Sequence, residues 1–180
     1  MNQSGATLLE LMLVLAISAI LLTIGIPSFV SASANSNVTS ATNAMVASLH
    51  LARSEAIKRG SRTVVCPSPG GAACAVSGGW EQGWIVFNDA NNNAALDSGE
   101  AVILTQGSML PGYRMTGQLS ASSYISYTPS GAAKKTSGAF QAGHLTVCEA
   151  LDSTVSARQI IISKTGRPRT ARVTLAACPS

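Results

Sequence analysis

The sequence has few charged and few aromatic side chains for a chain of 180 residues. Charged residues make up 11% of it and aromatic residues 4%, and both fractions are low for a cytosolic enzyme. Neither of the two histidines, His50 and His144, has a cysteine or aspartate at the spacing of a metal site. No serine lies in a Gly-x-Ser-x-Gly turn, and no glycine-rich loop has the spacing that binds phosphate. The composition therefore predicts a protein that is not an enzyme and that needs no cofactor.

The first nine residues contain no lysine or arginine, although they precede a long apolar run. This run extends from Leu11 to Ile26, with Glu10 at its start and Pro27 after it. Counted from Ala6 it has 21 residues, and about 20 are enough for a helix to cross a bilayer. The alternative is a secretory signal peptide cut near Ala32-Ser33-Ala34, but such a peptide begins with basic residues. The sequence favours a membrane helix whose carboxylate, costly at membrane depth, indicates a function.

The segment Gly5-Ala6-Thr7-Leu8-Leu9-Glu10-Leu11 resembles the class III leader of type IV pilins and pseudopilins. The resemblance implies that a prepilin peptidase removes residues 1–5 by cutting between Gly5 and Ala6, and that Ala6 becomes the methylated N-terminus. It also implies a transmembrane helix over residues 6–27, anchored in the inner membrane. Glu10 is then the fifth residue of the mature chain. Its carboxylate is expected to attract the cationic N-terminal amine of a subunit and so to recruit it into a filament.

After a short polar stretch, the apolar residues recur at intervals of three and four from Val38 onward. This spacing predicts that the helix continues over residues 28–60 as an amphipathic half, and that the whole helix spans about residues 6–59. The expected apolar positions are Val38, Ala41 or Thr42, Met45, Leu49, Ala52 and Ala56. Glu55 and Arg59 stand four apart as an exposed pair, and Gly60 is the expected helix cap.

The remaining region, residues 61–180, is rich in short β-type segments separated by glycine and serine. Expected strands are residues 62–66, 84–87, 101–105, 124–127, 145–148, 159–163 and 173–175. Trp80 and Trp84 are expected to pack in the core or against the helix. Four cysteines in an exported chain indicate two disulfides, for which three pairings are possible. We prefer Cys66–Cys74 as a local loop and Cys148–Cys178 as a bond that holds the C-terminus.

Several segments in order along the chain resemble the H-type pseudopilins and the FimT/FimU minor pilins. They are Leu51–Gly60, Val64–Ser68, Gly83–Asp89 and Gly99-Glu100. The resemblance implies an α+β type IV pilin fold, in which the second half of a long N-terminal helix packs on antiparallel β-sheet. It further implies a globular domain in the periplasm, assembly with other major and minor pilins, and a final place in a pilus at the cell surface.

The polar segment between two expected strands has the spacing of a calcium loop. Its candidate ligands, at loop positions 1, 3, 5, 9 and 12, are Asp89, Asn91, Asn93, Asp97 and Glu100. Position 6 is Ala94, where the EF-hand has glycine for its turn, and the flanks are strands rather than helices. We favour a polar loop whose side chains bond their own backbone, with calcium as the weaker alternative.

Charge is distributed unequally along the chain. Residues 1–100 hold four basic and six acidic side chains, whereas residues 101–180 hold eight basic and two acidic ones. No acidic residue follows Asp152. The net charge of +6 on residues 101–180 favours a polyanionic partner.

The basic residues gather around an expected turn at Gly166 and Pro168. The segment resembles the Gly-Arg-x-Arg element of FimT-type pilins, which the resemblance associates with binding DNA for natural transformation. Gly166, Arg167 and Arg169 match that element, and Lys164 and Arg172 are added for their charge. No aromatic residue interleaves with them in the sequence, so we expect contacts to the phosphate backbone and no base stacking. A basic hairpin that only meets a neighbouring pilin is the alternative.

The sequence thus predicts a minor type IV pilin that binds DNA without sequence preference for uptake. Two alternatives stay open: a structural minor pilin that primes pilus assembly without touching DNA, and a GspH-type pseudopilin of type II secretion.

Overall fold

The computed structural model describes residues 8–151 and 153–179. The chain divides into two units, Met1–Asn37 and Val38–Ser180, and each is considered by itself. A single helix, α1 (Leu8–Arg59), contributes to both units. The predicted long helix is therefore confirmed over the described residues.

In the first unit, α1 exposes its apolar side chains. From Leu8 to Val30, the large apolar side chains that the structure describes are between 51% and 78% exposed. Within the described residues, α1 is the one helix long and apolar enough to cross a membrane. The hydroxyl of Thr23 donates to the carbonyl of Ile20 at 2.7 Å, so this polar group is satisfied inside the helix. A helix that is apolar all round is suited to a membrane or to a bundle of similar helices.

In the second unit, α1 buries the face that the sequence spacing predicts. The expected positions Val38, Thr42, Met45, Leu49, Ala52 and Ala56 are buried, and so is Ser48. Gly60 follows the helix with φ +64°, the left-handed conformation expected of a glycine cap. The Arg59 Nε lies 2.6 Å from a carboxylate oxygen of Glu55, which confirms the expected pair. The hydrogen bond from Arg59 lowers the pKa of Glu55.

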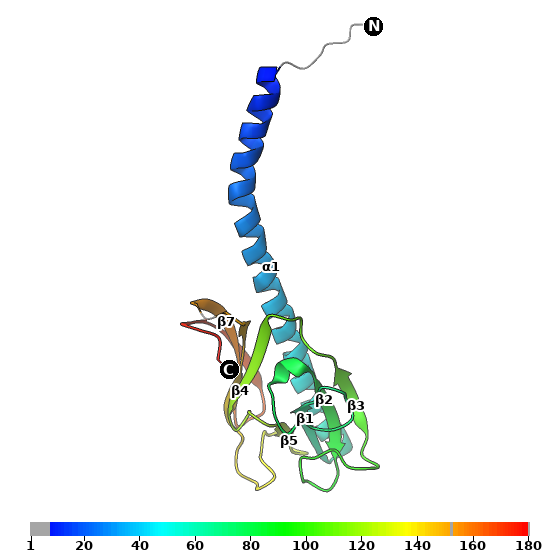
Figure 1. Ribbon diagram of the computed structural model, residues 1–180. Helices are drawn as coiled ribbons and strands as arrows, with labels where there is room; N and C mark the ends of the chain where they lie inside the picture. Colours follow the sequence, from blue (N-terminus) through cyan, green and yellow to red (C-terminus); the bar gives the residue numbers. More distant parts are fainter. Residues whose placement is uncertain (1–7, 152, 180) are drawn as a thin grey trace. The chain divides into compact units, whose positions relative to one another are not determined.

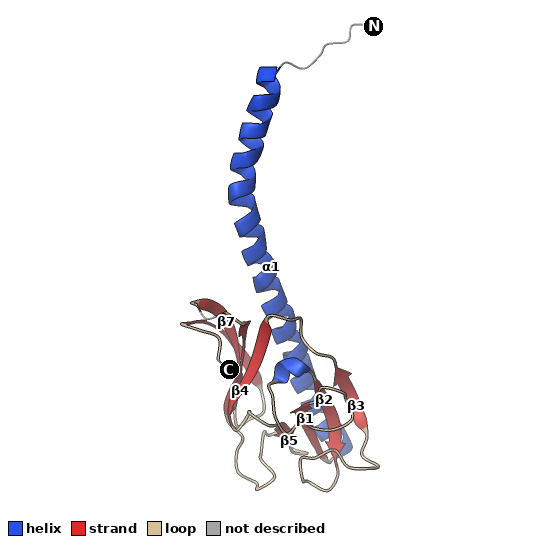
Figure 2. Ribbon diagram, in the orientation of Figure 1, coloured by secondary structure: helices blue, strands red, loops and turns tan. Residues whose placement is uncertain are grey.

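Two antiparallel sheets of four strands each follow the helix (Figures 1 and 2). The first sheet has the order β3-β2-β1-β5, and the second has the order β4-β6-β7-β8. The first contains β1 (Arg62–Pro67), β2 (Trp84–Asp89), β3 (Val102–Gln106) and β5 (Ile125–Tyr127). The second contains β4 (Tyr113–Leu119), β6 (Gly143–Glu149), β7 (Val155–Ile162) and β8 (Pro168–Leu175). A 3-10 turn, η1 (Trp80–Gln82), precedes β2.

One core joins the helix to both sheets. The buried residues of this core include Met45 and Leu49 from α1, Val86 from β2 and Ile160 from β7. Trp80 and Trp84 are buried, as expected, and each has its indole N–H satisfied. The Trp84 indole donates to the hydroxyl of Ser48 at 2.9 Å, so Ser48 is buried although its polarity predicted the outer face of the helix.

The expected strands differ from the observed ones mainly in the second sheet. β4 is missing from the prediction: its apolar residues Tyr113, Met115 and Leu119 alternate with polar ones, but Gly117 interrupts the pattern. This glycine packs tightly, since a Cβ there would lie 2.8 Å from the Trp80 indole nitrogen. β7 and β8 are also longer than predicted, and β8 begins at Pro168 rather than near residue 173.

Both disulfides pair the cysteines that the sequence analysis preferred. Cys66 is bonded to Cys74, and Cys148 to Cys178. The second bond, with Val155 and Ala157, forms a small separate cluster on the second sheet. It attaches the C-terminal segment to that sheet.

Candidate nucleic-acid interface

The residues expected to govern processing lie at the start of the chain. Gly5 and Ala6 fall outside the described residues, so the structure does not describe the expected cleavage point. Glu10 lies in the first turn of α1 and is exposed.

The expected basic turn connects β7 and β8. It is closed by a hydrogen bond from the Gly166 N–H to the Ser163 carbonyl, at 2.9 Å. Gly166 has φ +78°, which disfavours any residue with a side chain. A Cβ at Gly166 would also lie 2.1 Å from the carbonyl oxygen of Gly131. Glycine is therefore required here both for the turn and for the close approach of a second loop.

The turn rests on a rigid part of the second unit. A Cβ at Gly166 would lie 3.2 Å from the ring of Tyr127, a fully buried residue at the end of β5. The carbonyl of Gly131 in turn accepts a hydrogen bond from the Arg53 Nε of α1, at 2.9 Å. Burial raises the pKa of Tyr127, whose hydroxyl has no hydrogen-bond partner within the described residues. These contacts hold the turn of the hairpin, while the side chains of Lys164, Arg167, Arg169 and Arg172 are exposed.

The structure corrects the placement of two expected residues. Arg169 and Arg172 lie on β8 rather than around the turn, and only Lys164 and Arg167 lie on the turn itself. Because side chains alternate along a strand, Arg169 and Arg172 point to opposite faces of the second sheet. The register pairs Arg169 with Ile161 and Arg172 with Arg158.

Arg158 is a basic residue of this hairpin that sequence reasoning missed as a site. It lies on β7 and shares a face with Arg172, and directly opposed like charges are unfavourable. Over the described part of the chain, no carboxylate comes within ion-pair distance of the hairpin's basic side chains. Its five basic residues are Arg158, Lys164, Arg167, Arg169 and Arg172. The hairpin therefore carries clustered positive charge, and no carboxylate among the described residues neutralises it.

The structure also brings an aromatic ring to the basic turn, contrary to the sequence-based expectation. Phe140 is 58% exposed, and the Lys164 Nζ lies 6.0 Å from the centre of its ring. The Nζ of Lys134 lies 5.4 Å from the same centre. The signal was not visible in the sequence, because Phe140 belongs to a distant loop that folds back beside the hairpin.

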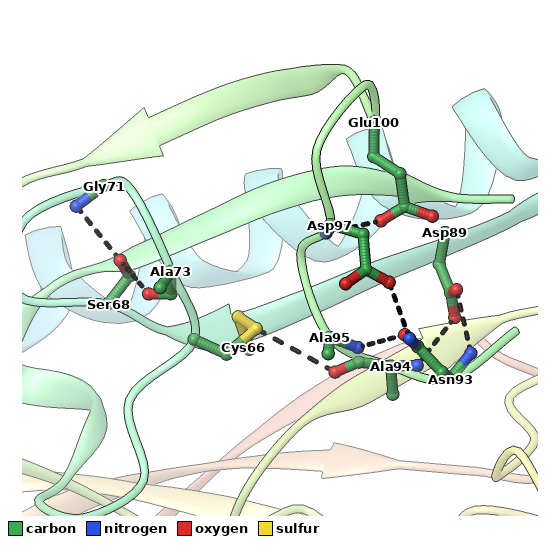
Figure 3. Close-up of a disulfide and its surroundings, with 11 residues drawn as sticks. Cys66, Ser68, Gly71, Ala73, Asp89, Asn93, Ala94, Ala95, Asp97 and Glu100 are labelled. Atoms are coloured by element: carbon green, nitrogen blue, oxygen red, sulfur yellow. Dashed lines mark hydrogen bonds between the residues drawn. A yellow bond between two sulfur atoms is a disulfide. The ribbon is translucent and has the colours of Figure 1, made fainter. Parts of the chain in front are cut away.

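In the candidate calcium loop, two of the three carboxylates accept hydrogen bonds from the backbone of the loop itself (Figure 3). Asp89 is fully buried and accepts hydrogen bonds from the backbone N–H groups of Asn93 and Ala94, each at 3.0 Å. Glu100 accepts from the N–H groups of Ala90 and Asp97, at 2.7 Å and 3.2 Å. This pattern supports the polar-loop interpretation.

The remaining carboxylate of this loop, that of Asp97, is held by side chains. The amides of Asn91 and Asn93 donate to one oxygen of Asp97, at 2.8 Å and 2.6 Å, and these bonds lower its pKa. The loop also covers a disulfide, since the Cys74 sulfur lies 3.9 Å from the carbonyl oxygen of Ala94. Among the described residues, no three His, Cys, Asp or Glu side chains are grouped as a metal site.

An N-terminal helix that is apolar at first and then packs on antiparallel sheets defines the type IV pilin fold. The sequence matches the family described as "Type II transport protein GspH" over residues 41–166. Residues 1–26 match the "Prokaryotic N-terminal methylation motif". The chain belongs to the GspH family, whose pilins and pseudopilins are structural proteins of assembled filaments. The methylation motif implies peptidase processing and, with the apolar helix, indicates anchoring in a membrane.

The fold is similar to that of the type IV minor pilin FimU of Pseudomonas aeruginosa, solved in two crystal forms. One shares 18% identity with a TM-score of 0.55, covering 78% of this chain and 99% of that chain. The other shares 17% identity with a TM-score of 0.58, covering 81% of this chain and 97% of that chain. No curated protein matches the sequence. The family match ends at residue 166, so it does not include the arginines of β8.

Proposed function

We propose that this chain is a minor pilin of a type IV pilus and that its β7–β8 hairpin binds DNA for uptake. The observation that carries the proposal is the clustered charge of the hairpin, which has no carboxylate partner among the described residues, beside a turn held by close contacts. Arginine offers a planar fork of donors that matches phosphate oxygens, and Arg167 and Arg169 are both exposed. Binding through phosphates is independent of base sequence.

The position of β8 explains how arginines on opposite faces act together. β8 is the last strand in the order of its sheet as described, so its outer edge has no neighbouring strand. Side chains from both faces of an edge strand reach past that edge. A phosphate backbone lying along β8 can therefore meet Arg169 from one face and Arg172 from the other. The unpaired backbone N–H groups of the edge add further donors for phosphate.

The test is a gel shift of the full chain in nonionic detergent with several unrelated duplexes. Wild type should bind all of them. If four phosphates are neutralised, the logarithm of the binding constant should fall with the logarithm of the salt concentration with a slope of about −3.6. The double variant Arg167→Gln/Arg169→Gln should lose most of this binding and roughly half of the slope. Its matched control is Lys58→Gln/Arg114→Gln, which removes the same charge at exposed sites away from the hairpin. Equal binding by the two double variants would remove the DNA assignment.

The second candidate is a structural minor pilin that primes assembly, or a pseudopilin of type II secretion. The exposed apolar half of α1 favours an assembly role, because a filament would bury it against similar helices. In either case we propose that a peptidase cuts between Gly5 and Ala6 and methylates Ala6. Glu10 then recruits a subunit through its N-terminal amine. Mass spectrometry of the mature N-terminus tests the cut, and loss of filament incorporation in Glu10→Gln tests the recruitment.

A further inference from the structure

Phe140 is an exposed aromatic residue in a chain that has few of them, and the ammonium groups of two lysines lie near its ring. Its ring is 58% exposed, whereas Trp80, Trp84, Phe87 and Tyr127 are buried. An ammonium lies over the ring from each of two segments, Lys134 at 5.4 Å and Lys164 at 6.0 Å. These distances are at the outer limit of a cation–π contact, about 6 Å, so the contacts are weak and do not explain the exposure.

The backbone that carries Phe140 is held firmly. Phe140 and Lys134 are opposite each other in a bridge between two antiparallel segments, shown in the yellow part of Figure 1. The bridge is flanked by hydrogen bonds from Lys135 N–H to the Ala139 carbonyl, at 2.9 Å, and from Gln141 N–H to the Ala133 carbonyl, at 3.0 Å. An exposed apolar ring on a segment held by hydrogen bonds is suited to binding a flat partner. The segment is already ordered, so binding costs little conformational entropy.

The side chains of two buried polar residues hold this segment through hydrogen bonds. The side chain of Gln141 is fully buried and donates to the carbonyls of Ser120 and Tyr124, at 2.8 Å and 2.6 Å. The Arg62 Nη1 donates to the carbonyl of Lys134, at 2.7 Å. The structure therefore orients the ring and the first lysine together, beside the basic turn.

We propose that Phe140 is a stacking platform for an unpaired nucleobase, so that the hairpin also binds single-stranded DNA. A ring of this kind stacks on any base. The incoming base would take the place of the weakly held ammonium groups of Lys134 and Lys164, which are then free to contact the adjacent phosphates. The inference rests on the proposed function, since it assumes that DNA reaches the hairpin. It goes further by naming the form of DNA that the site prefers, which phosphate contacts alone do not distinguish.

The test uses the full chain in nonionic detergent, with a short oligothymidine and a duplex of the same length as probes. Phe140→Leu keeps an apolar side chain but removes the aromatic face. It should weaken oligothymidine binding roughly tenfold, as the loss of one stacked base does, and leave duplex binding unchanged. Phe140→Trp should bind oligothymidine at least as well as wild type. An unchanged melting temperature shows that both variants are folded.

Salt dependence separates the ring from the lysines. Phe140→Leu should leave the salt slope for oligothymidine unchanged, because stacking releases no counterions. Lys134→Gln/Lys164→Gln should make that slope less steep by about 1.4, at roughly 0.7 per phosphate contact on a single strand. Wild-type affinity for oligothymidine in Phe140→Leu would overturn the inference. An equal loss on both probes would also overturn it, because it would show that the ring supports the phosphate contacts of the hairpin and does not stack on a base.

The outcomes for the inference and for the proposed function are distinguishable. If wild type binds neither probe, the proposed function fails and the inference fails with it. If wild type binds both probes and Arg167→Gln/Arg169→Gln abolishes duplex binding, the proposed function stands. The behaviour of Phe140→Leu on oligothymidine then decides the inference alone.

Discussion

The acidic loop at residues 89–100 and the basic β7–β8 hairpin are both rich in charge, yet they use it in opposite ways. The carboxylates of the loop accept hydrogen bonds from the loop's own backbone and amides. The cations of the hairpin have no carboxylate partner in the described structure. Clustered charge that is satisfied internally shapes a loop, whereas clustered charge that faces solvent can recognise a partner. Sequence spacing alone does not separate these two cases.

The largest effect is expected at Gly166, on which the hairpin depends for its position. In Gly166→Ala the residue has a positive φ, and its new Cβ would lie 2.1 Å from the carbonyl oxygen of Gly131. The substitution should lower the free energy of unfolding by about 3 kcal/mol. The control is Gly138→Ala, which has φ +84° and open space, and which should cost about 1 kcal/mol. Urea denaturation measures both. Similar costs in the two variants would show that the contact with Gly131 does not position the hairpin.

The next effect is expected at Asp89, the buried carboxylate of the acidic loop. Asp89→Ala leaves the N–H groups of Asn93 and Ala94 without their acceptor and should cost about 2 kcal/mol. Ser98→Ala, at an exposed position of the same loop, should cost about 0.5 kcal/mol or less. If Asp89→Ala unfolds at the same urea concentration as wild type, its carboxylate does not stabilise the loop.

A smaller effect is expected from acid, through Asp97. The pKa of Asp97 is lower in the folded state than in the unfolded state, where it is about 4. The contribution of Asp97 to stability is therefore fully present above the unfolded pKa, and it is lost as the pH falls through the folded pKa. Asp97→Asn lacks this contribution at every pH. The difference in melting temperature between wild type and Asp97→Asn should therefore be greatest above pH 5 and shrink below about pH 4. A difference that stays constant with pH would contradict this role.

The smallest effect is expected from calcium. The candidate ligands Asp89, Asn93 and Glu100 already serve as hydrogen-bond partners within the loop, and Ala94 occupies the position of the EF-hand glycine. Calcium and EDTA should give the same melting temperature. A rise in calcium that EDTA reverses and magnesium does not reproduce would revive the calcium interpretation and weaken the contrast with the hairpin.

Much of the architecture was predictable, because it depends on neighbouring residues. The spacing from Val38 to Ala56 predicted the buried face of the helix, and Gly60 predicted its end. β4 was missed because Gly117 interrupts its pattern, and the contacts that require glycine there, with the Ala121 carbonyl and the Trp80 indole, are made only in the folded structure. The burial of Ser48 has the same origin, since its partner is the indole of Trp84.

The candidate site was predictable in part. The basic residues around Gly166 and the need for glycine there follow from the sequence. Their distribution on two faces of β8 does not, because it depends on where the strand begins, and the sequence placed that start too late. The nearness of Phe140 to Lys164 could not be inferred either, since a loop from outside the hairpin supplies the ring.

The sequence by itself determined the apolar helix, its amphipathic continuation, the turn at Gly166 and the excess of positive charge after Asp152. Each of these follows from residues close together in the chain, whose spacing dictates which face is apolar and where the backbone can turn. Only the tertiary structure decided which charges are neutralised. Asp89 is satisfied by N–H groups that the loop directs inward, while the hairpin's cations and the ring of Phe140 face solvent together because separate segments converge there.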